Sequence, residues 1–395
     1  MQDSLIHAKF KEAGISRVKS NDKNKNIIYP FFMKEYKLNQ ITHKRILGRN
    51  VYKENDQELS LFWGGAALEI NVKAREVYAC ISTDYADHEQ WLTVEINGAP
   101  LSRFMLNKEK TWYCLARNLN PQKENLISII KDVQPMSEDA VHSLIIHSVG
   151  LDDAGEFCPV KPRDCKMEFI GDSITAGEGL CGAPEEQDWI SLWMRASGTY
   201  ARLLARKMNA DWNTMGKCGW GIICGWDGNL ENKIPPHYEN VCSVMKDKKS
   251  LAMGAQQKWD FYNGKGSDYV IINLGTNDDG GLRVLKEKGD TGREEELTDA
   301  VTDFLKVVRK NNPSAKIIWV WGMLGLETVP ALVQKGVDAY KTASGDKAVY
   351  TLELESLEKL EINYEEKGSR GHPGAKTHQA AAQRLYDFIS SLRGL

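Results

Sequence analysis

The sequence lacks the features that mark several large classes of protein. Its first residues carry no basic stretch followed by an apolar one, and no later run is long and apolar enough to span a bilayer. We therefore expect a cytoplasmic protein with no membrane partner. The formal net charge of -3 gives no broad basic field, which argues against nucleic acid as a partner.

Patterned cysteines and the common cofactor motifs are also missing. The 8 cysteines include no CxxC pair and no zinc-like spacing, and no HExxH sequence occurs. A phosphate-binding GxxxxGK[ST] loop and a GxSxG elbow are absent, and the glycine pattern from Gly219 places Gly225 one position late for a dinucleotide fingerprint. We expect reduced thiols, no metal and no organic cofactor.

The first half of the chain has the pattern of short strands. Within residues 91–96 every second residue is apolar, and Asn97-Gly98 follows as a turn signal. Similar segments recur at residues 67–72, 77–81, 126–130 and 144–146. We predict an all-β sandwich as a first domain, residues 1–160. Its first forty residues are polar and lysine-rich, and we expect them to form an arm or an edge strand.

The second half alternates strands with longer helical patterns. Two prolines and a charge cluster at residues 158–163 mark a linker before it. Apolar runs predict strands at residues 167–170, 268–274, 316–321 and 349–354, and apolar residues at three-to-four spacing predict helices at residues 200–208, 294–308 and 378–392. We predict an α/β domain with a mostly parallel sheet over residues 161–395.

Three short motifs carry residues that suit acyl transfer. Ser173 stands in Gly-Asp-Ser after a strand, Asn277 in Gly-Thr-Asn-Asp after another, and His372 before Pro373 near the last helix. Each has a bland interpretation as a cap or a loop residue. Together they favour a catalytic interpretation with Ser173 as nucleophile and His372 as base, because a serine hydroxyl needs a base to accept its proton. His378 is expected to be a surface or packing residue.

These motifs and a glycine block resemble those of SGNH, or GDSL-type, esterases in order and spacing. The resemblance implies an α/β/α domain, a Ser173 nucleophile, a His372 base, and an oxyanion hole formed by Ser173, Gly219 and Asn277. Gly219 is preferred over its neighbours Gly216 and Gly221 as the glycine donor.

The usual third member of the catalytic triad is missing from the chain. Many SGNH enzymes have an aspartate three residues before the histidine, but Ser369 stands there. A backbone carbonyl, which we prefer, or a carboxylate such as Glu365 or Glu366 would then orient His372.

The β half narrows the resemblance. A jelly-roll-like domain followed by a proline-containing linker and residues 168–179 is similar to carbohydrate esterase family 2, some members of which use a dyad. This implies a serine esterase that removes O-acetyl groups from plant polysaccharides or oligosaccharides such as xylan, through an acetyl-serine intermediate. Trp220, Trp226 and Asp278 are candidate substrate-binding residues near the glycine block and Asn277.

Two alternative functions stay open at this point. A lipid or thioester hydrolase of the same fold would need a longer apolar acyl pocket. The second alternative is a carbohydrate-binding protein whose hydrolase half is inactive, although the complete Ser-Gly-Asn-His set argues against it. A homo-oligomer is plausible because a β-sandwich presents edges and faces to a copy of itself.

Overall fold

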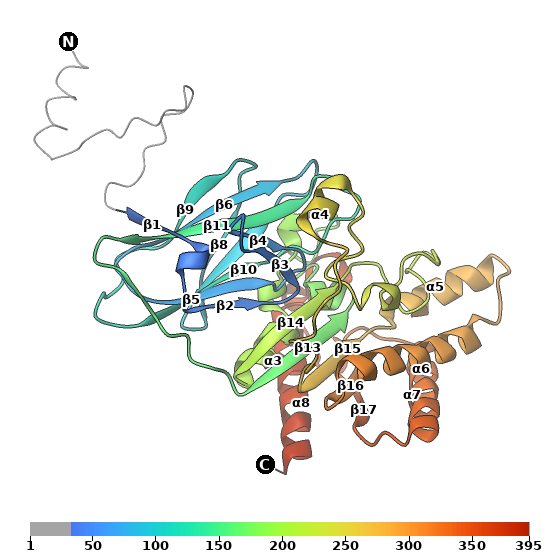
Figure 1. Ribbon diagram of the computed structural model, residues 1–395. Helices are drawn as coiled ribbons and strands as arrows, with labels where there is room; N and C mark the ends of the chain where they lie inside the picture. The colour runs from blue at the N-terminus through green and yellow to red at the C-terminus, as the bar shows by residue number, and fades with distance from the viewer. Residues whose placement is uncertain (1–32, 395) are drawn as a thin grey trace, which may run out of the picture.

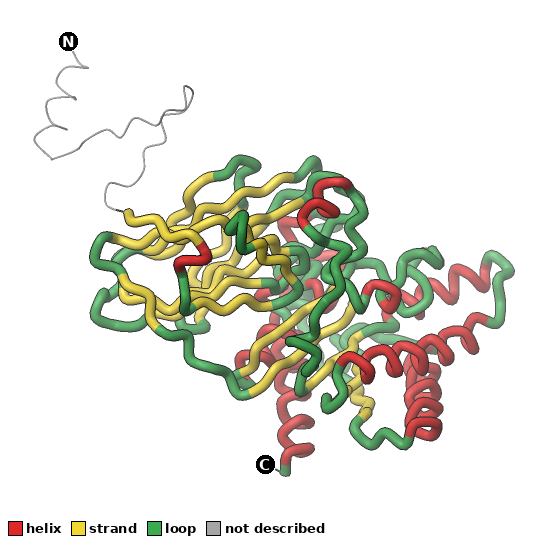
Figure 2. The backbone as a smooth tube through the Cα atoms, viewed as in Figure 1, coloured by secondary structure: helices red, strands yellow, loops and turns green. Residues whose placement is uncertain are grey.

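The computed structural model describes residues 33–394, so residues 1–32, which hold most of the expected N-terminal arm, lie outside the described residues. The described chain forms an antiparallel β domain beside an α/β domain (Figure 1). Figure 2 shows the strands of the first domain at one side of the molecule and most of the helices at the other. The fold class predicted from the sequence is confirmed.

Within residues 33–394 the β domain contains two antiparallel sheets of six strands. One has the order β3-β4-β11-β6-β9, with β1 also on β11, and the other has the order β12-β5-β10-β7-β8, with β2 on β5. The strands are β1 (Met33–Lys37), β2 (Lys44–Leu47), β3 (Asn50–Lys53), β4 (Glu58–Leu61), β5 (Ala67–Lys73), β6 (Val77–Asp84), β7 (Trp91–Ile96), β8 (Ala99–Met105), β9 (Thr111–Ala116), β10 (Asn125–Lys131), β11 (Ser143–Asp152) and β12 (Glu156–Cys158). A 3-10 turn, η1 (Leu38–Gln40), follows β1.

The two sheets share one apolar core. Alternation along each strand sends every second side chain inward, as Leu68 and Ile70 of β5 show beside Ile129 and Ile127 of β10, their partners in register. The inner side chains of the facing sheet come from β4, β6 and β11: Leu59, Leu61, Val77, Ala79, Ile81, Leu144, Ile146, Val149 and Leu151. The alternation read from the sequence therefore reflects packing of one sheet on the other.

The second domain is built on a parallel five-stranded sheet in the order β14-β13-β15-β16-β17. Its strands are β13 (Cys165–Gly171), β14 (Ala210–Gly216), β15 (Tyr269–Asn273), β16 (Lys316–Trp321) and β17 (Val349–Glu353). Its α-helices are α2 (Ser173–Ala176), α3 (Tyr200–Lys207), α4 (Lys248–Met253), α5 (Thr276–Glu287), α6 (Arg293–Asn311), α7 (Val329–Ser344) and α8 (Ala375–Arg393). Short 3-10 turns are η2 (Ser191–Trp193), η3 (Ala196–Gly198), η4 (Pro235–His237), η5 (Tyr364–Glu366) and η6 (Ser369–Gly371).

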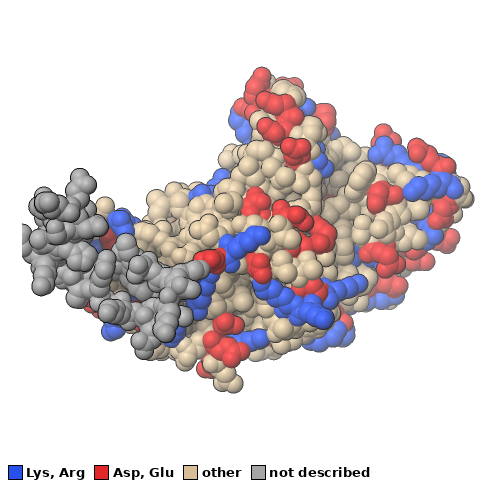
Figure 3. Space-filling view, turned by 90° about the horizontal axis from the view of Figure 1, so that it is seen from above, with Lys and Arg blue, Asp and Glu red and all other residues tan. Residues whose placement is uncertain are grey.

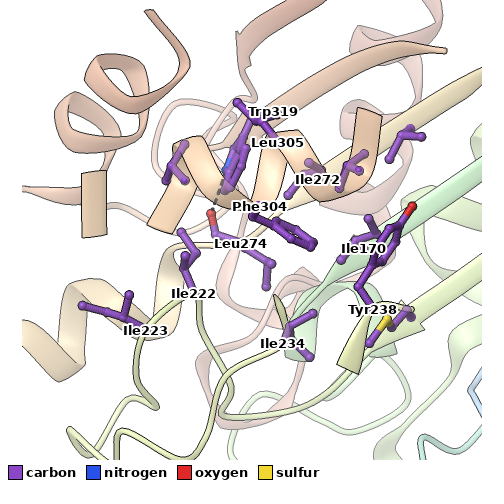
Figure 4. Close-up of a cluster of buried hydrophobic side chains, with 14 of the residues drawn as sticks. Ile170, Ile222, Ile223, Ile234, Tyr238, Ile272, Leu274, Phe304, Leu305 and Trp319 are labelled. Atoms are coloured by element: carbon purple, nitrogen blue, oxygen red, sulfur yellow. Dashed lines mark hydrogen bonds between the residues drawn. The ribbon is translucent and has the colours of Figure 1, made fainter. Parts of the chain in front are cut away.

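Helices cover both faces of this sheet. Helices α3 and α8 pack on one face against Phe169 and Ile271, and α6 and α7 pack on the other. Figure 4 shows the second face, where Phe304 and Leu305 of α6 lie among Ile170, Ile272 and Trp319 of the sheet. The Trp319 indole N–H donates to the Leu274 carbonyl over 3.1 Å, which satisfies its polar atom inside this core. The result is the three-layer α/β/α arrangement.

A buried polar contact joins the two domains. Arg49 of the β domain is fully buried, and its guanidinium lies 2.9 Å from the carboxylate of Glu168 on β13. The Trp63 indole donates to the Val241 carbonyl, and the Trp212 indole donates to the Gly65 carbonyl, each over 2.7 Å. The predicted boundary at residue 160 falls between β12 and β13 and stays a prediction.

The surface of the molecule carries charges of both signs. On the face that Figure 3 displays, acidic and basic side chains are interspersed, without a broad area of one sign. This distribution agrees with the small formal net charge of -3.

Candidate active site

Ser173 begins helix α2 at the carboxyl end of the strand β13. Its neighbour Asp172 is the N-cap, whose Oδ1 accepts a hydrogen bond from the Ile174 N–H over 3.0 Å. Burial raises the pKa of Asp172 to about 7. The strand order reverses at β13, between β14 and β15, and open α/β sheets bind ligands outside the strand ends at such a point. The fold therefore places Ser173 where a ligand is expected.

His372 lies against the serine, although 199 positions separate the two in the chain. It stands in the loop between β17 and α8, and its Nε2 is 2.9 Å from the Ser173 Oγ. Its Nδ1 is 3.2 Å from the Arg370 carbonyl oxygen. A carbonyl can only accept, so Nδ1 carries the proton and Nε2 is left to accept the proton of the serine hydroxyl.

The Arg370 carbonyl occupies the place that an aspartate takes in a triad. Ser369 is fully buried, and its hydroxyl has no hydrogen-bond partner among the described residues. Glu366 pairs with Lys376, and Glu365 is exposed to solvent. Of the alternatives that the sequence left open, the backbone carbonyl is the one that contacts the imidazole.

Asn277 and the glycine block follow β15 and β14, the two strands that flank β13 in the sheet. Asn277 is the second residue of α5, and its Nδ2 donates to the Trp220 carbonyl over 2.9 Å, which leaves one amide proton for another acceptor. Gly219 has a φ of +76° and is half-buried, whereas Gly216 and Gly221 are buried. A side chain at Gly221 would clash with the carboxylate of Asp278. These positions favour Gly219 as the glycine that faces the site.

Asp278 has a structural role, which corrects the prediction that it binds substrate. It is fully buried, and its carboxylate accepts hydrogen bonds from the backbone N–H groups of Ile222 and Ile223, each over 2.8 Å, and from that of Cys224. Burial raises its pKa to about 6, against the effect of these donors. Asp278 therefore fixes the loop that follows Gly219, and the adjacent Asp279 accepts from the N–H groups of Thr328, the N-cap of α7, and Val329, its first residue.

The two candidate tryptophans differ in exposure. Trp220 is half-buried, and its ring centroid lies 5.4 Å from that of His237. The Trp226 side chain is 64% exposed, and its Cδ1 lies 3.2 Å from the point where a Cβ on Gly219 would stand. An exposed indole beside this glycine suits stacking on a ligand, and the substrate-binding role of both residues stays a prediction.

Glu178 is a residue of the site that no sequence motif pointed to. Its Oε1 accepts from the Arg370 Nε over 2.9 Å, and its Oε2 is 3.6 Å from the His372 Nε2. It stands five residues after Ser173, but 192 positions separate it from Arg370. No local pattern could have revealed this contact.

The described part of the chain contains neither a cluster of metal-binding side chains nor a membrane-spanning helix. Among residues 33–394, no group of three His, Cys, Asp or Glu side chains is arranged to hold a metal ion. No helix within the same residues has the length and apolar character needed to cross a membrane.

Both halves of the chain match known families. The model of the GDSL-like lipase/acylhydrolase family matches residues 169–380, which is more than half of the chain. The chain belongs to this family. The model of the carbohydrate esterase 2 N-terminal domain matches residues 46–160 of the same GDSL-like protein. The resemblance to carbohydrate esterase family 2 is thereby confirmed.

Individual relatives of this GDSL-like protein carry esterase names. The acetyl xylan esterase Est2A from the rumen bacterium Butyrivibrio proteoclasticus is 34% identical, covers 92% of this chain and 99% of its own, and superposes with a TM-score of 0.84. The cellulase/esterase CelE of Acetivibrio thermocellus is 27% identical over 84% of this chain, which spans 37% of CelE. The acetylxylan esterase / glucomannan deacetylase of Cellvibrio japonicus is 21% identical over 87% of each chain.

Proposed function

We propose that the protein is a serine esterase that removes O-acetyl groups from carbohydrates. The observation that carries the proposal is a chain of two hydrogen-bond contacts. The Ser173 Oγ lies 2.9 Å from the His372 Nε2, and the His372 Nδ1 lies 3.2 Å from the Arg370 carbonyl oxygen. These three residues supply a nucleophile, a base and the group that selects the tautomer of the base. The esterase names of the relatives agree with it.

The reaction that fits these groups is acyl transfer in two steps. The Ser173 oxygen bonds to the acetyl carbonyl carbon while the His372 Nε2 takes the hydroxyl proton. The oxyanion accepts hydrogen bonds from the N–H groups of Ser173 and Gly219 and from the free amide proton of Asn277. The carbon–oxygen bond to the sugar then breaks, and His372 returns the proton to the sugar oxygen. Water, deprotonated by His372, releases acetate and restores the serine.

The surroundings of the serine favour a small acyl group on a polar alcohol. Glu178 and Arg370 place charged groups next to His372, where a long alkyl chain would have to displace their polar contacts. The exposed Trp226 lies beside Gly219, and an indole face packs well against a sugar ring. We therefore place acetylated xylo- or manno-oligosaccharides and polysaccharides first among substrates. The cytoplasmic location and the homo-oligomer stay predictions.

Chain-length profiling tests this proposal. We expect p-nitrophenyl acetate to be cleaved with a kcat/KM at least about 10-fold above that of p-nitrophenyl octanoate. A pocket that fits an acetyl group binds the additional methylenes of the octanoyl group poorly in the transition state. Ser173→Ala should lower kcat at least about 10,000-fold without changing the melting temperature. Acetate release from acetylated xylo- and manno-oligosaccharides, followed by NMR, then identifies the deacetylated position. A preference for octanoate would support a lipid or thioester hydrolase, and absence of turnover would support a binding protein.

A further inference from the structure

The backbone carbonyl that orients His372 belongs to a residue with an unusual conformation. Arg370 has a φ of 57° and a ψ of 28°, in the left-handed region that residues with a side chain rarely adopt. The position of a main-chain acceptor in a loop depends on the conformation of that loop. Contacts around Arg370 must therefore hold this conformation if the carbonyl is to stay at the imidazole.

The segment that follows the nucleophile supplies these contacts. The Arg370 N–H donates to the Glu186 carbonyl over 3.0 Å, and its guanidinium donates to the Gln187 carbonyl and to the carboxylate of Glu178. The neighbouring Ser369 N–H donates to the Gly179 carbonyl over 2.9 Å. Thus both the backbone and the side chain of Arg370 are tied to residues 178–187.

Glu178 connects this attachment to the nucleophile. Its own N–H donates to the Ser173 carbonyl over 3.0 Å, and its side chain is 5% exposed. One carboxylate oxygen accepts from Arg370, and the other is 3.6 Å from the His372 Nε2. A charge so deeply buried needs a partner, and the Arg370 guanidinium provides one.

We propose that the Glu178–Arg370 ion pair is the positioning device that replaces the aspartate of a triad. It holds the Arg370 carbonyl at the His372 Nδ1, and its second carboxylate oxygen stabilises the positive charge that His372 acquires during the reaction. An aspartate would perform both tasks from one side of the ring. Here the neutral carbonyl orients the ring at Nδ1 and the carboxylate provides the charge near Nε2. This inference rests on the proposed roles of Ser173 and His372.

Cys218 and His378, which lie next to this pair, keep one charge state near neutral pH, whereas Asp172, whose pKa burial raises to about 7, titrates in this range in the variant and in its control alike. The thiol of Cys218 lies beside Glu178, and burial raises its pKa well above the usual value. His378 of α8 lies behind His372, and burial lowers its pKa to about 3. Neither group changes its charge between pH 5 and 8, where the test is made.

Glu178→Gln tests the role of the negative charge on Glu178. The side chain keeps nearly the same shape, and its amide oxygen can still accept a hydrogen bond from Arg370. We expect the acidic limb of the kcat/KM profile for p-nitrophenyl acetate to move to lower pH by roughly 1 unit, because the imidazolium loses a neighbouring negative charge. The titration midpoint of His372, followed by NMR of ¹³C-labelled histidine, should move in the same direction. Glu366→Gln is the matched control, because it removes an exposed ion pair of the same loop away from His372.

Arg370→Gly tests the positioning. Glycine adopts a φ of 57° without strain, so the loop can fold while the guanidinium clamp is lost. We expect kcat to fall on the order of 10- to 100-fold with KM within about 3-fold, because a small displacement of the base slows proton transfer. Arg370→Lys, which keeps the charge, should restore part of kcat.

The outcomes separate this inference from the proposed function. If the profile and the His372 midpoint of Glu178→Gln equal those of Glu366→Gln, or if Arg370→Gly keeps the wild-type kcat, the inference is wrong and the esterase function stands. If wild-type protein shows no turnover that depends on Ser173, the proposed function is wrong. The NMR midpoint then still decides whether Glu178 acts on His372, because it needs no turnover.

Discussion

The side chain of Asn277 is fixed before any substrate arrives. One amide proton is used in the hydrogen bond to the Trp220 carbonyl, over 2.9 Å, and the side chain is largely buried. Asp278, the next residue, anchors the loop that contains Ile222 and Ile223. The two adjacent residues therefore have different roles: Asn277 presents a donor to the site, and Asp278 holds the glycine loop in place. Such preorganised donors cost no rearrangement when charge develops on the substrate.

Replacement of Asn277 measures this donor. We expect Asn277→Ala to lower kcat about 100- to 1,000-fold with a small change in KM, because the donor acts mainly on the oxyanion of the transition state. Asn277→Asp should be slower still, since a carboxylate repels the oxyanion. Steady-state kinetics with p-nitrophenyl acetate checks both, and the exposed Asn363→Ala serves as control. A kcat within 10-fold of wild type in Asn277→Ala would remove this residue from the oxyanion hole.

Much of the site could be predicted from the sequence, because Ser173, Asn277 and His372 each stand in a contiguous motif next to a strand or helix end. Asp278 was misassigned because sequence adjacency does not show side-chain direction. On a helix, successive side chains point about 100° apart, so the neighbour of a site residue faces elsewhere. The Glu178–Arg370 contact could not be predicted, since only the folded chain brings these distant residues together.

At the level of elements, strand β14 of the second domain was not predicted because it carries polar residues at buried positions. β14 holds Asn213 and Thr214 at buried positions, and the Asn213 amide donates to the carboxylate of Glu168 over 2.8 Å. An apolar pattern cannot reveal a strand whose polar groups find partners only in the folded protein.

Helix α5 was not predicted for another reason. Its Gly280-Gly281 pair lowers helix propensity, yet a side chain at Gly281 would clash with the Gly225 carbonyl.

Gln134 links a loop of the β domain to the glycine block of the catalytic domain. It lies after β10, and its Oε1 accepts from the Cys218 N–H over 2.7 Å, with both residues buried. Gln134→Leu leaves this N–H without a partner, which costs about 1–3 kcal/mol of stability and releases the loop before Gly219. We expect kcat for p-nitrophenyl acetate to fall about 10-fold, since a shifted donor loses catalytic power.

The matched control for this link is Gln122→Leu, because Gln122 is an exposed glutamine of the same β domain. It should keep the wild-type kcat and melting temperature. A Gln134→Leu variant with lowered stability and unchanged kcat would show that the β domain supports the fold without setting the oxyanion loop.

At the scale of the whole molecule, the two domains form one unit with buried ionisable groups. Arg49, Glu168 and Lys131 are all buried near the domain interface, and burial lowers the pKa of Lys131 to about 7. Histidines are buried in both domains. Burial lowers the pKa of His147 to about 4 and that of His378 to about 3. Stability must therefore depend on pH through groups that take no part in the reaction.

His378 gives a prediction about this dependence whose sign follows from proton linkage. Its Nδ1 accepts from the Tyr200 N–H over 3.1 Å, and the folded protein keeps the ring neutral, while the unfolded chain binds a proton below about pH 6.5. The unfolded state then binds more protons, so this group lowers the free energy of unfolding as pH falls from 6.5 toward 3. Asp172 and Asp278, with raised pKa values, act in the opposite direction, so the informative quantity is a difference between variants.

His378→Asn keeps an acceptor for the Tyr200 N–H and removes the titrating ring. We expect the variant to be less stable than wild type at pH 7.5 because it loses the stacked contact with Tyr200, and this deficit should shrink by about 2 kcal/mol at pH 5. Urea unfolding at the two pH values measures the deficit. His43→Asn, at an exposed position, should show the wild-type dependence. An equal deficit at both pH values would mean that the buried ring takes up its proton without unfolding, and that the packing of α8 against α3 tolerates a charge.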